Sequence, residues 1–389
     1  MSQTEHTTLG QSCEFFNGKA HEKAIDDKGK YIVVNSKFVS TEGKTFKRTN
    51  EQLFPLYIGD IVMVMSDVPN GKTLAKCFVI DKDDTYSLNQ RICCIRSKDF
   101  DTKYLYYQLN RHPHLLAFNN GENQSNLRKD DILACPLLKP SLEEQKRMVE
   151  ELDQTFAKLN QAKANTLQNL QNAKELFETE LRNVFENKGD GWGEKSLKEI
   201  TTLLGDGLHG TPKYTDDGDY YFVNGNNLQD GKIEFKENTK RVSKDQYEKY
   251  KKNLTDRTIL VSINGTLGNV AFYNNEKIML GKSACYFNII EDIDKNFIKY
   301  NLSSPIFMKY AHSEATGATI KNVSLKSMRD YKIPFPKSLQ TQQAIVAKLD
   351  ALKTQTQALE ASYQAKLNNL EELYSGILKR AFENQLIGV

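Results

Sequence analysis

The sequence predicts an α+β protein in which two globular regions alternate with two long helices that pair as an antiparallel coiled coil. Three observations support this prediction: a gapless repeat, a heptad spacing of apolar residues in each copy, and short β-rich runs before each copy. Residues 338–384 repeat residues 141–187 at a constant offset of 197 positions. A repeat of this length indicates two copies of one unit, which are commonly related by a pseudo-two-fold axis.

We expect four parts along the chain: a first globular domain at 1–140, a central long helix at 141–187, a second globular domain at 188–336 and a C-terminal long helix at 337–389. A chain of 389 residues is long enough for two or three ordinary domains. Its 39% hydrophobic and 10% aromatic content supports real cores and argues against a disordered chain.

The globular regions contain short runs of β-branched and aromatic residues bounded by turn residues, which is typical of strands. These runs lie at 31–34, 60–65, 220–223, 258–262 and 284–290. The two regions also resemble each other faintly, since 59–64 matches 256–261 and 100–107 matches 293–300. The chain therefore reads as a tandem duplication whose helices have stayed similar while its domains have diverged.

Both repeats are predicted to be long helices, because no proline interrupts them and Ser141 with Glu144 forms a capping-box pattern. Apolar residues alternate steps of four and three, the seam of a coiled coil. In the second helix this stripe is Ile345, Leu349, Leu352, Thr356, Leu359, Tyr363, Lys366, Leu370, Leu373 and Ile377. In the first it is Val149, Leu152, Phe156, Leu159, Thr166, Leu170, Ala173, Phe177 and Val184. The simplest partner of each seam is the other helix; the alternative is that each helix packs on the domain before it.

Composition limits the cellular setting. The net charge is +3, and because residues 141–187 carry −3 and residues 338–384 carry 0, the remaining chain carries +6. This modest basic excess is compatible with a polyanionic partner. A polar N-terminus without an apolar core and the lack of a long apolar run predict a cytoplasmic protein. The six cysteines form no CxxC pair, so we expect reduced, buried thiols.

Catalytic and metal-binding patterns are not found. Asn70-Gly-Lys-Thr73 resembles the end of a P-loop, but Ser66 stands where that motif needs glycine, so a turn is the better interpretation. The glycine-rich residues 262–268 form either a loop that approaches a phosphate backbone or an ordinary hairpin turn. His112 and His114 lack further ligands at metal spacing. We therefore predict no catalytic residue, no bound metal and no cofactor in this chain.

Two different domains held on one rod suit a linear polymer such as duplex DNA, whose turn repeats about every 34–36 Å. The site would be bipartite and asymmetric, with an unread spacer. Candidate base-reading residues are polar side chains of the loops. They are Asn17, Lys19, His21, Glu22, Asn35, Ser36 and Lys37 in the first domain, and His209, Thr211, Lys213, Tyr214, Asn224, Asn226, Asn227, Asn264 and Thr266 in the second.

The layout resembles the specificity subunit of type I restriction–modification systems. The resemblance rests on the tandem architecture, on the helix entries at 140–145 and 336–342, and on the Phe-Glu-Asn that closes each repeat. Residues 203–212, 265–271 and 15–22 also resemble motifs of that family's target recognition domains.

This resemblance implies a non-catalytic subunit that reads double-stranded DNA through its two target recognition domains. It implies that the helices Ser141 to Asn187 and Ser338 to Asn384 dock two adenine-methyltransferase subunits. Restriction subunits can join such a complex. S-adenosylmethionine, ATP and Mg would then belong to the partner subunits. The alternatives are a coiled-coil adaptor that binds no nucleic acid and a stand-alone DNA-modifying enzyme.

Overall fold

The structure is a computed structural model that describes residues 5–68, 71–97, 99–119, 124–189 and 191–383. The chain divides into two compact units. Unit 1 comprises Met1–Asn165 and Lys366–Val389, and unit 2 comprises Thr166–Ala365. Each unit therefore contains one globular domain and segments of both long helices.

The long helices are α6 (Leu142–Glu186) and α11 (Leu339–Glu383), each of 45 residues. Asn384, where the second helix was expected to end, lies outside the described residues. Across the part of the chain that the structure describes, no helix combines the length and the apolar character that crossing a membrane requires.

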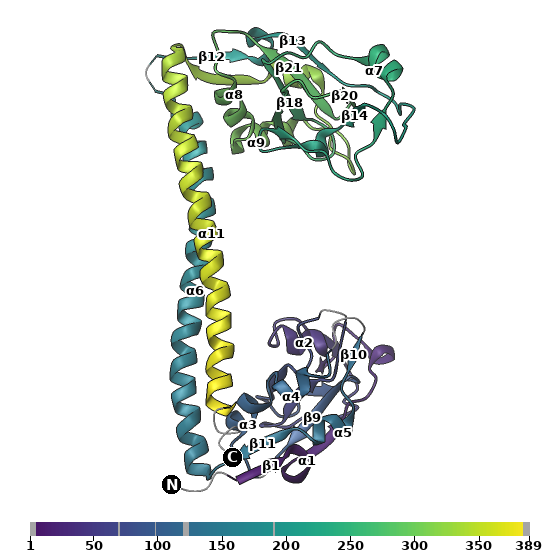
Figure 1. Cartoon of the computed structure of the whole chain (residues 1–389), viewed down its shortest axis with the longest axis vertical. Helices are drawn as coiled ribbons and strands as arrows, with labels where there is room; N and C mark the ends of the chain where they lie inside the picture. The colour runs from purple at the N-terminus through teal and green to yellow at the C-terminus, as the bar shows by residue number, and fades with distance from the viewer. Residues whose placement is uncertain (1–4, 69–70, 98, 120–123, 190, 384–389) are drawn as a thin grey trace. The chain divides into compact units, whose positions relative to one another are not determined.

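The globular domain of unit 1 is built from short elements that precede α6 (Figure 1). In order they are β1 (Glu5–Thr8), α1 (Leu9–Ser12), β2 (Glu14–Asn17), η1 (Glu22–Ala24), β3 (Tyr31–Val34), α2 (Ser36–Ser40), β4 (Lys47–Thr49), β5 (Ile61–Val64), β6 (Ser66–Asp67), β7 (Cys77–Val79), β8 (Tyr86–Leu88), β9 (Ile92–Arg96), α3 (Thr102–Leu109), α4 (Pro113–Leu116), β10 (Ser125–Asn126), α5 (Lys129–Leu133) and β11 (Pro136–Lys139).

The globular domain of unit 2 lies between α6 and α11 in sequence. In order its elements are β12 (Trp192–Ser196), η2 (Leu197–Ile200), β13 (Thr201–Asp206), β14 (Tyr220–Val223), η3 (Gly225–Asn227), β15 (Leu228–Gln229), β16 (Lys232–Ile233), β17 (Arg241–Val242), α7 (Lys244–Tyr250), β18 (Thr258–Ser262), β19 (Val270–Phe272), β20 (Ile278–Leu280), β21 (Ala284–Ile289), α8 (Lys295–Leu302), α9 (Pro305–Glu314), α10 (Leu325–Asp330) and β22 (Lys332–Pro336).

The two domains share one sheet topology. The four-stranded sheet β2-β9-β5-β7 of unit 1 corresponds to β13-β21-β18-β19 of unit 2, and both are antiparallel. A three-stranded sheet, β4-β3-β8 or β17-β14-β20, contains one parallel pair in each case. The strand that opens each domain pairs with the strand that closes it, as β1 with β11 and β12 with β22. The duplication inferred from faint sequence similarity is therefore a duplication of the fold.

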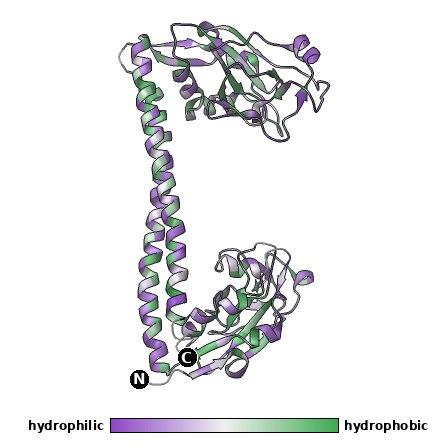
Figure 2. Ribbon diagram, in the orientation of Figure 1, coloured by the Kyte–Doolittle hydropathy of each residue, from purple (hydrophilic) through white to green (hydrophobic). Residues whose placement is uncertain are grey.

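Each four-stranded sheet is buried on both faces, because successive side chains of a strand point to opposite sides. In β5, Ile61 and Met63 join the core shared with α3 and the long helices, whereas Val62 and Val64 join the core beneath the three-stranded sheet. Ile259 and Leu260 of β18 divide in the same way. Figure 2 shows the resulting pattern, with hydrophobic strands inside both domains and mixed helices.

The two long helices run antiparallel, since the start of α6 meets the end of α11 in unit 1 and the reverse holds in unit 2. In unit 1 the rings of Phe156 and Tyr374 stack at 4.1 Å, and Lys163 pairs with Glu371 at 3.0 Å. In unit 2 Lys348 pairs with Glu180 at 2.5 Å. The α+β class with two globular domains and a pair of antiparallel helices is confirmed. Each helix also packs on its preceding domain, through Val149 in α6 and Leu349 in α11, so both expected contacts exist.

The seam predicted for α6 is buried or half-buried throughout, but the seam predicted for α11 is wrong at three positions. Leu359, Lys366 and Leu373 are exposed. Leu349 and Thr356 of the predicted stripe are buried, but so are Val346 and Leu367, which the stripe leaves out. Val346 and Leu367 lie 197 positions after Val149 and Leu170 of the α6 seam. The prediction followed the most apolar heptad spacing of α11, and this gave the wrong register because some leucines of α11 face outward.

A buried glutamine joins each domain to its helix. The Gln145 side chain is 0% exposed; its Nε2 donates to the Pro140 carbonyl at 2.9 Å and its Oε1 accepts from the Asp101 N–H at 2.8 Å. In unit 2 the Gln342 side chain donates to Pro336 at 3.1 Å and accepts from Asp294 at 2.9 Å. Asp101 and Asp294 are the N-caps of α3 and α8, so the glutamine fixes the domain's helix onto the long helix.

A second joint lies two turns further along. The Tyr107 hydroxyl donates to Asp153 at 2.5 Å, and the Lys103 ammonium pairs with the same carboxylate at 2.6 Å. Tyr300 donates in the same way to Asp350. Burial by itself would raise the pKa of Asp153, but the hydrogen bonds from Lys103 and Tyr107 outweigh it and hold that pKa below its usual range.

We expect Gln145→Leu to destabilise unit 1 by about 2–6 kcal/mol, because one buried and one half-buried main-chain group lose their partner and each loss costs about 1–3 kcal/mol. Chemical denaturation monitored by fluorescence measures the change. The control is Gln154→Leu at an exposed position of the same helix, which we expect to stay within about 0.5 kcal/mol. Equal unfolding midpoints for the two variants would contradict the structural role of Gln145.

Candidate nucleic-acid interface

The loops at one end of the unit 1 sheets are held together by main-chain hydrogen bonds. The Lys19 N–H donates to the Leu88 carbonyl at 3.0 Å, and Gln90 donates back to Lys19 at 3.0 Å. Met65 donates to Arg91 at 3.0 Å, and Leu127 donates to Met65 at 2.8 Å. Loops that follow β2, β5, β8 and β10 are thus gathered into one cluster.

Unit 2 repeats these bonds one by one. Leu208 donates to Leu280 at 2.7 Å, and Lys282 donates back to Leu208 at 3.0 Å. Ile263 donates to Ser283 at 3.0 Å, and Val323 donates to Ile263 at 2.8 Å. These bonds join main-chain atoms only, and we call the arrangement the loop framework.

A glycine opens the first loop of each framework for a steric reason. A Cβ atom on Gly18 would lie 2.0 Å from the Asn89 carbonyl oxygen, and one on Gly207 would lie 2.1 Å from the Leu280 carbonyl oxygen. No side chain fits at such a distance. These glycines belong to the sequence segments that were singled out as resembling recognition-domain motifs, and the close approach gives that pattern a physical meaning.

The first-domain candidates fall into two groups. Asn17, Lys19, Glu22 and Lys37 are exposed on or beside the loop framework. Asn35, by contrast, caps α2 by accepting from the Phe38 N–H at 2.9 Å, and Ser36 is half-buried behind it. The four exposed side chains remain candidate base readers.

The second-domain candidates divide in the same way. His209, Thr211, Lys213, Tyr214, Asn226 and Thr266 are exposed. Asn264 is half-buried, and its side chain donates to the Asn322 side chain at 2.9 Å. Asn224 accepts from the Ser283 hydroxyl at 3.0 Å and has nearly the backbone angles of Asn35, with φ of −115° and −114°. The two asparagines are therefore equivalent supports of the framework.

Two candidates lie inside their domains, which corrects the expectation that they face a ligand. The His21 ring is 1% exposed, with Nδ1 2.7 Å from the Lys19 carbonyl and Nε2 2.8 Å from the Ser87 hydroxyl. Asn227 is 5% exposed, and its amide donates to the Glu234 carbonyl at 3.0 Å. Both are polar because they satisfy buried main-chain or hydroxyl groups, which a loop sequence alone does not reveal.

The candidate set also missed exposed residues that the framework holds. Gln90 and Arg91 follow β8, Lys282 follows β20, and the Lys321 carbonyl accepts from the Gly265 N–H at 2.9 Å. The internal match between Leu88–Cys93 and Leu280–Cys285 could have pointed to the first three. Nothing in the sequence pattern pointed to Lys321, which is brought to the loops by the tertiary fold.

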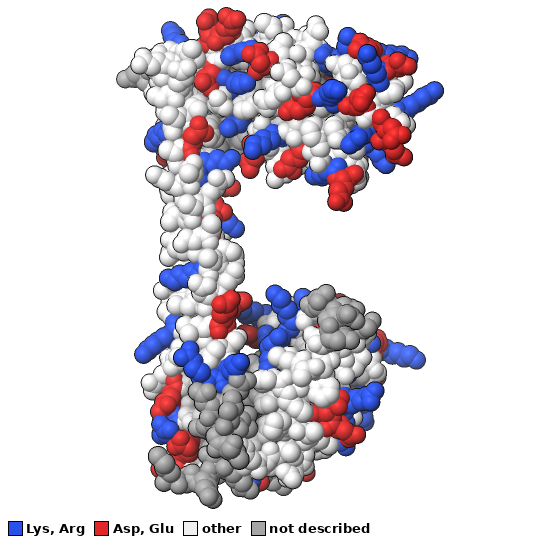
Figure 3. All heavy atoms as spheres, viewed as in Figure 1, with Lys and Arg blue, Asp and Glu red and all other residues white. Residues whose placement is uncertain are grey.

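Charged side chains of both signs are interspersed over the second globular domain (Figure 3). Among the residues that the structure describes, no group of three histidine, cysteine or acidic side chains could hold a metal ion. His112 caps α4 by accepting from the His114 N–H at 3.1 Å. Burial, with a smaller contribution from His114, lowers the pKa of His112 to about 4.

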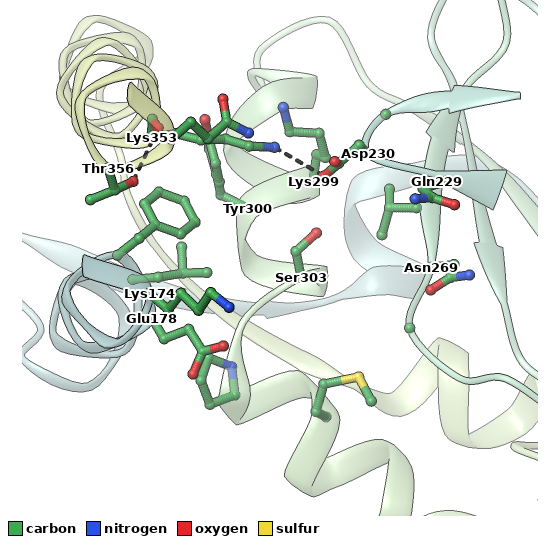
Figure 4. A pocket seen from close by; sticks show the side chains of 18 of the residues that line it. Lys174, Glu178, Gln229, Asp230, Asn269, Lys299, Tyr300, Ser303, Lys353 and Thr356 are labelled. Carbon is green, nitrogen blue, oxygen red and sulfur yellow. Dashed lines mark hydrogen bonds and ion pairs between the residues drawn. The ribbon is translucent and has the colours of Figure 1, made fainter. Parts of the chain in front are cut away.

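A cavity lies between each domain and its helices, at equivalent places in the two units. In unit 2 it has about 810 Å³ and is charged, with Lys353 paired to Asp230 at 3.0 Å (Figure 4). Burial lowers the pKa of Lys299, which also lines it. In unit 1 the cavity has about 630 Å³ and is lined by aromatic and aliphatic side chains such as Tyr107, Tyr374 and Leu378.

The arrangement defines a class of protein: a duplicated recognition module, in which one loop framework is mounted twice on a pair of antiparallel helices. Residues 1–169 and 189–369 match the family described as Type I restriction modification DNA specificity domain. The chain belongs to this family, as its sequence resemblance suggested. The family provides DNA specificity and is not catalytic, which confirms the expectation that the chain is not an enzyme.

Individual relatives agree with this assignment. The type I restriction enzyme EcoBI specificity subunit of Escherichia coli is 24% identical over 335 residues, which cover 77% of this chain and 69% of that protein. A solved structure from work on complex assembly and conformational transition of the type I R-M system has a TM-score of 0.71 at 19% identity and covers 98% of both chains. The HsdS subunit from Thermoanaerobacter tengcongensis has a TM-score of 0.59 at 16% identity, covering 99% of this chain and 98% of that one.

We expect unit 1 to lose stability on acidification because His112 is kept neutral by folding. His112 binds a proton near pH 6.5 in the unfolded chain and near pH 4 in the folded chain, so the free energy of unfolding falls as the pH drops between these values. We expect a loss of about 2 kcal/mol at pH 5 relative to pH 7. His112→Asn keeps an N-cap side chain but does not titrate there. Denaturation at pH 7 and pH 5 measures both proteins. An identical loss in the variant would contradict this origin.

Proposed function

We propose that this chain reads a bipartite, asymmetric site on double-stranded DNA and holds two adenine-methyltransferase subunits, and in the full complex restriction subunits, at that site. The observation that carries the proposal is the loop framework, present twice with the same main-chain bonds and with different exposed side chains. A fixed framework with variable side chains is what two readers of different half-sites require.

The differences fall at equivalent framework positions. Lys19 of the first domain is replaced by Leu208 of the second, and Gln90 by Lys282. Amide and cationic side chains contact different base edges in the major groove, since amides pair with adenine and cations with guanine. The two frameworks would therefore prefer different bases, which supports an asymmetric site.

We assign the first target recognition domain to residues 1–140 and the second to residues 188–336. The base readers that we propose are the exposed candidates Asn17, Lys19, Glu22, Lys37, His209, Thr211, Lys213, Tyr214, Asn226 and Thr266, together with Gln90, Arg91 and Lys282. Asn35, Asn224 and Asn264 act in this proposal as supports that hold the readers.

The helices Ser141 to Asn187 and Ser338 to Asn384 are the proposed docking elements for the methyltransferases. Leu176 and Leu373 stand 197 positions apart and are 49% and 43% exposed. Leu142 and Leu339 form a second such pair, at 51% and 37%. Exposed leucines at matching places of the two repeats suit two identical partner surfaces, because the recognition domains themselves differ. S-adenosylmethionine, ATP and Mg would be bound by the partner subunits, in the cytoplasm.

Single-molecule sequencing of genomic DNA, with and without this gene, tests the proposal directly. We expect one split motif, made of two different half-sites and a spacer, to lose adenine methylation when the gene is deleted. If no motif changes while a methyltransferase still co-purifies with the chain, the DNA-reading role is refuted and a protein adaptor is left.

We expect Lys213→Ala combined with Asn226→Ala to relax discrimination at the second half-site by about 10- to 100-fold, because a good base contact is worth about 1–3 kcal/mol. Binding of the complex to duplexes with each half-site altered in turn measures the change. Discrimination at the first half-site should be unchanged. The control is Asn274→Ala with Lys277→Ala, two exposed residues outside the framework. Equal effects of the two double variants would contradict the assignment.

A further inference from the structure

The two domains retain one basic pair at an equivalent surface position although most of their exposed residues differ. Lys47 and Arg48 lie on β4, whereas Lys240 directly precedes β17 and Arg241 begins it. Arg48 stands opposite Ile32 of β3, and Arg241 stands opposite Tyr221 of β14, in each case the second residue of the central strand. Lys240 accepts at its carbonyl from the Phe222 N–H, which places it as the equivalent of Lys47.

The neighbouring loop confirms that these positions are equivalent. The Asp26 N–H donates to the Arg48 carbonyl at 2.9 Å, and the Thr215 N–H donates to the Arg241 carbonyl at 3.0 Å. The segments that end at Asp26 and Thr215 are the ones that carry the exposed candidates Lys19 and Lys213. In both domains the basic pair is therefore hydrogen-bonded to the chain segment that carries proposed base readers.

Each arginine is held in place without being neutralised. The Arg48 guanidinium lies 5.1 Å from the Phe46 ring centre and donates to the carbonyls of Gly29 and Lys30 at 3.3 Å. The Arg241 guanidinium lies 4.7 Å from the Tyr221 ring centre and donates to the Tyr221 hydroxyl at 2.8 Å. Stacking orders a guanidinium and leaves its remaining donors for another acceptor.

The lysines are exposed, and within the described chain none of the four basic residues forms an ion pair. Nearby acidic residues Asp27 and Asp216 lie in the turns before β3 and β14. Lys47 and Lys240 stand opposite the third residues of β3 and β14. They therefore lie nearer to the C-terminal ends of these strands, where the loop framework begins, than to the turns that carry the acidic residues. Unpaired cations beside a recognition surface suit an anionic ligand.

We propose that Lys47, Arg48, Lys240 and Arg241 bind phosphate groups of the duplex beside the two half-sites. The proposal rests on the proposed DNA-reading function and separates two kinds of contact within it. Base contacts must differ between the domains because the half-sites differ, whereas phosphates are the same everywhere. A basic pair that is retained at one position, among exposed side chains that have changed, matches the sequence-independent contact.

The test uses the complex of this chain with its methyltransferase subunits, and a charge-removing variant with Lys47→Gln and Lys240→Gln. Binding to the motif-bearing duplex and to a scrambled duplex is measured from 50 to 400 mM salt. Each lost phosphate contact reduces the slope of log Kobs against log salt by about 0.9, so we expect a slope less negative by about 1.8. Affinity at 150 mM salt should fall by roughly 10- to 30-fold on both duplexes, with the ratio between them unchanged.

The matched control is Lys82→Gln with Lys277→Gln, which removes the same charge from two exposed residues. These residues precede β8 and β20, whereas the loop framework follows those strands. We expect its salt slope to stay at the wild-type value. An unchanged slope in the Lys47/Lys240 variant overturns the proposal, and so does a loss confined to the motif-bearing duplex, which would make these lysines base readers. Weakened assembly with the methyltransferase at an unchanged slope would also overturn it, in favour of a protein contact. If the wild-type complex binds neither duplex, the proposed function fails instead.

Discussion

The position of each loop framework depends on how one buried glutamine satisfies main-chain groups at the joint between domain and helix. Gln145 and Gln342 are fully buried, and each supplies one donor and one acceptor to main-chain groups of its own domain. Leaving such groups unpaired is costly, so the joint tolerates only a side chain with both functions and the right length. The loops at the far end of the sheets inherit their orientation from this contact, because the four-stranded sheet lies in one core with α3 or α8 and the long helices.

In the loop framework, main-chain groups make the bonds that hold the loops together. The bonds that gather the loops use N–H and carbonyl groups, and the glycines at 18 and 207 permit the close approach that those bonds need. The exposed side chains of the framework take no part in these main-chain bonds. Asn35 and Asn224 belong to the other class, since each supports a turn. A polar loop residue can thus belong to either class, and the distinction is visible only when its hydrogen-bond partners are known.

Much of the fold followed from the sequence because the repeat offset is constant and the apolar periodicity of α6 is regular. The seam of α11 could not be derived from hydrophobicity alone, since Leu359 and Leu373 face outward, whereas Val346 and Leu367, which the predicted stripe leaves out, are buried. The repeat would have predicted it better: adding 197 to the α6 seam residues Val149, Leu152 and Leu170 gives Val346, Leu349 and Leu367, which are buried. The candidate site was harder to predict. His21 and Asn227 look like loop readers in sequence, but burial is a property of long-range packing that no local pattern encodes.

The backbone character of the loop framework also bears on how such a protein changes over generations. Substitutions at exposed framework positions such as Lys19, Gln90 or Lys282 break none of the bonds that gather the loops. Surface substitutions of this kind usually alter stability by less than about 0.5 kcal/mol. A lineage can therefore explore new recognition sequences by single mutations without passing through unfolded intermediates. The two halves of this one chain carry different exposed side chains on equivalent main-chain bonds, as this separation allows.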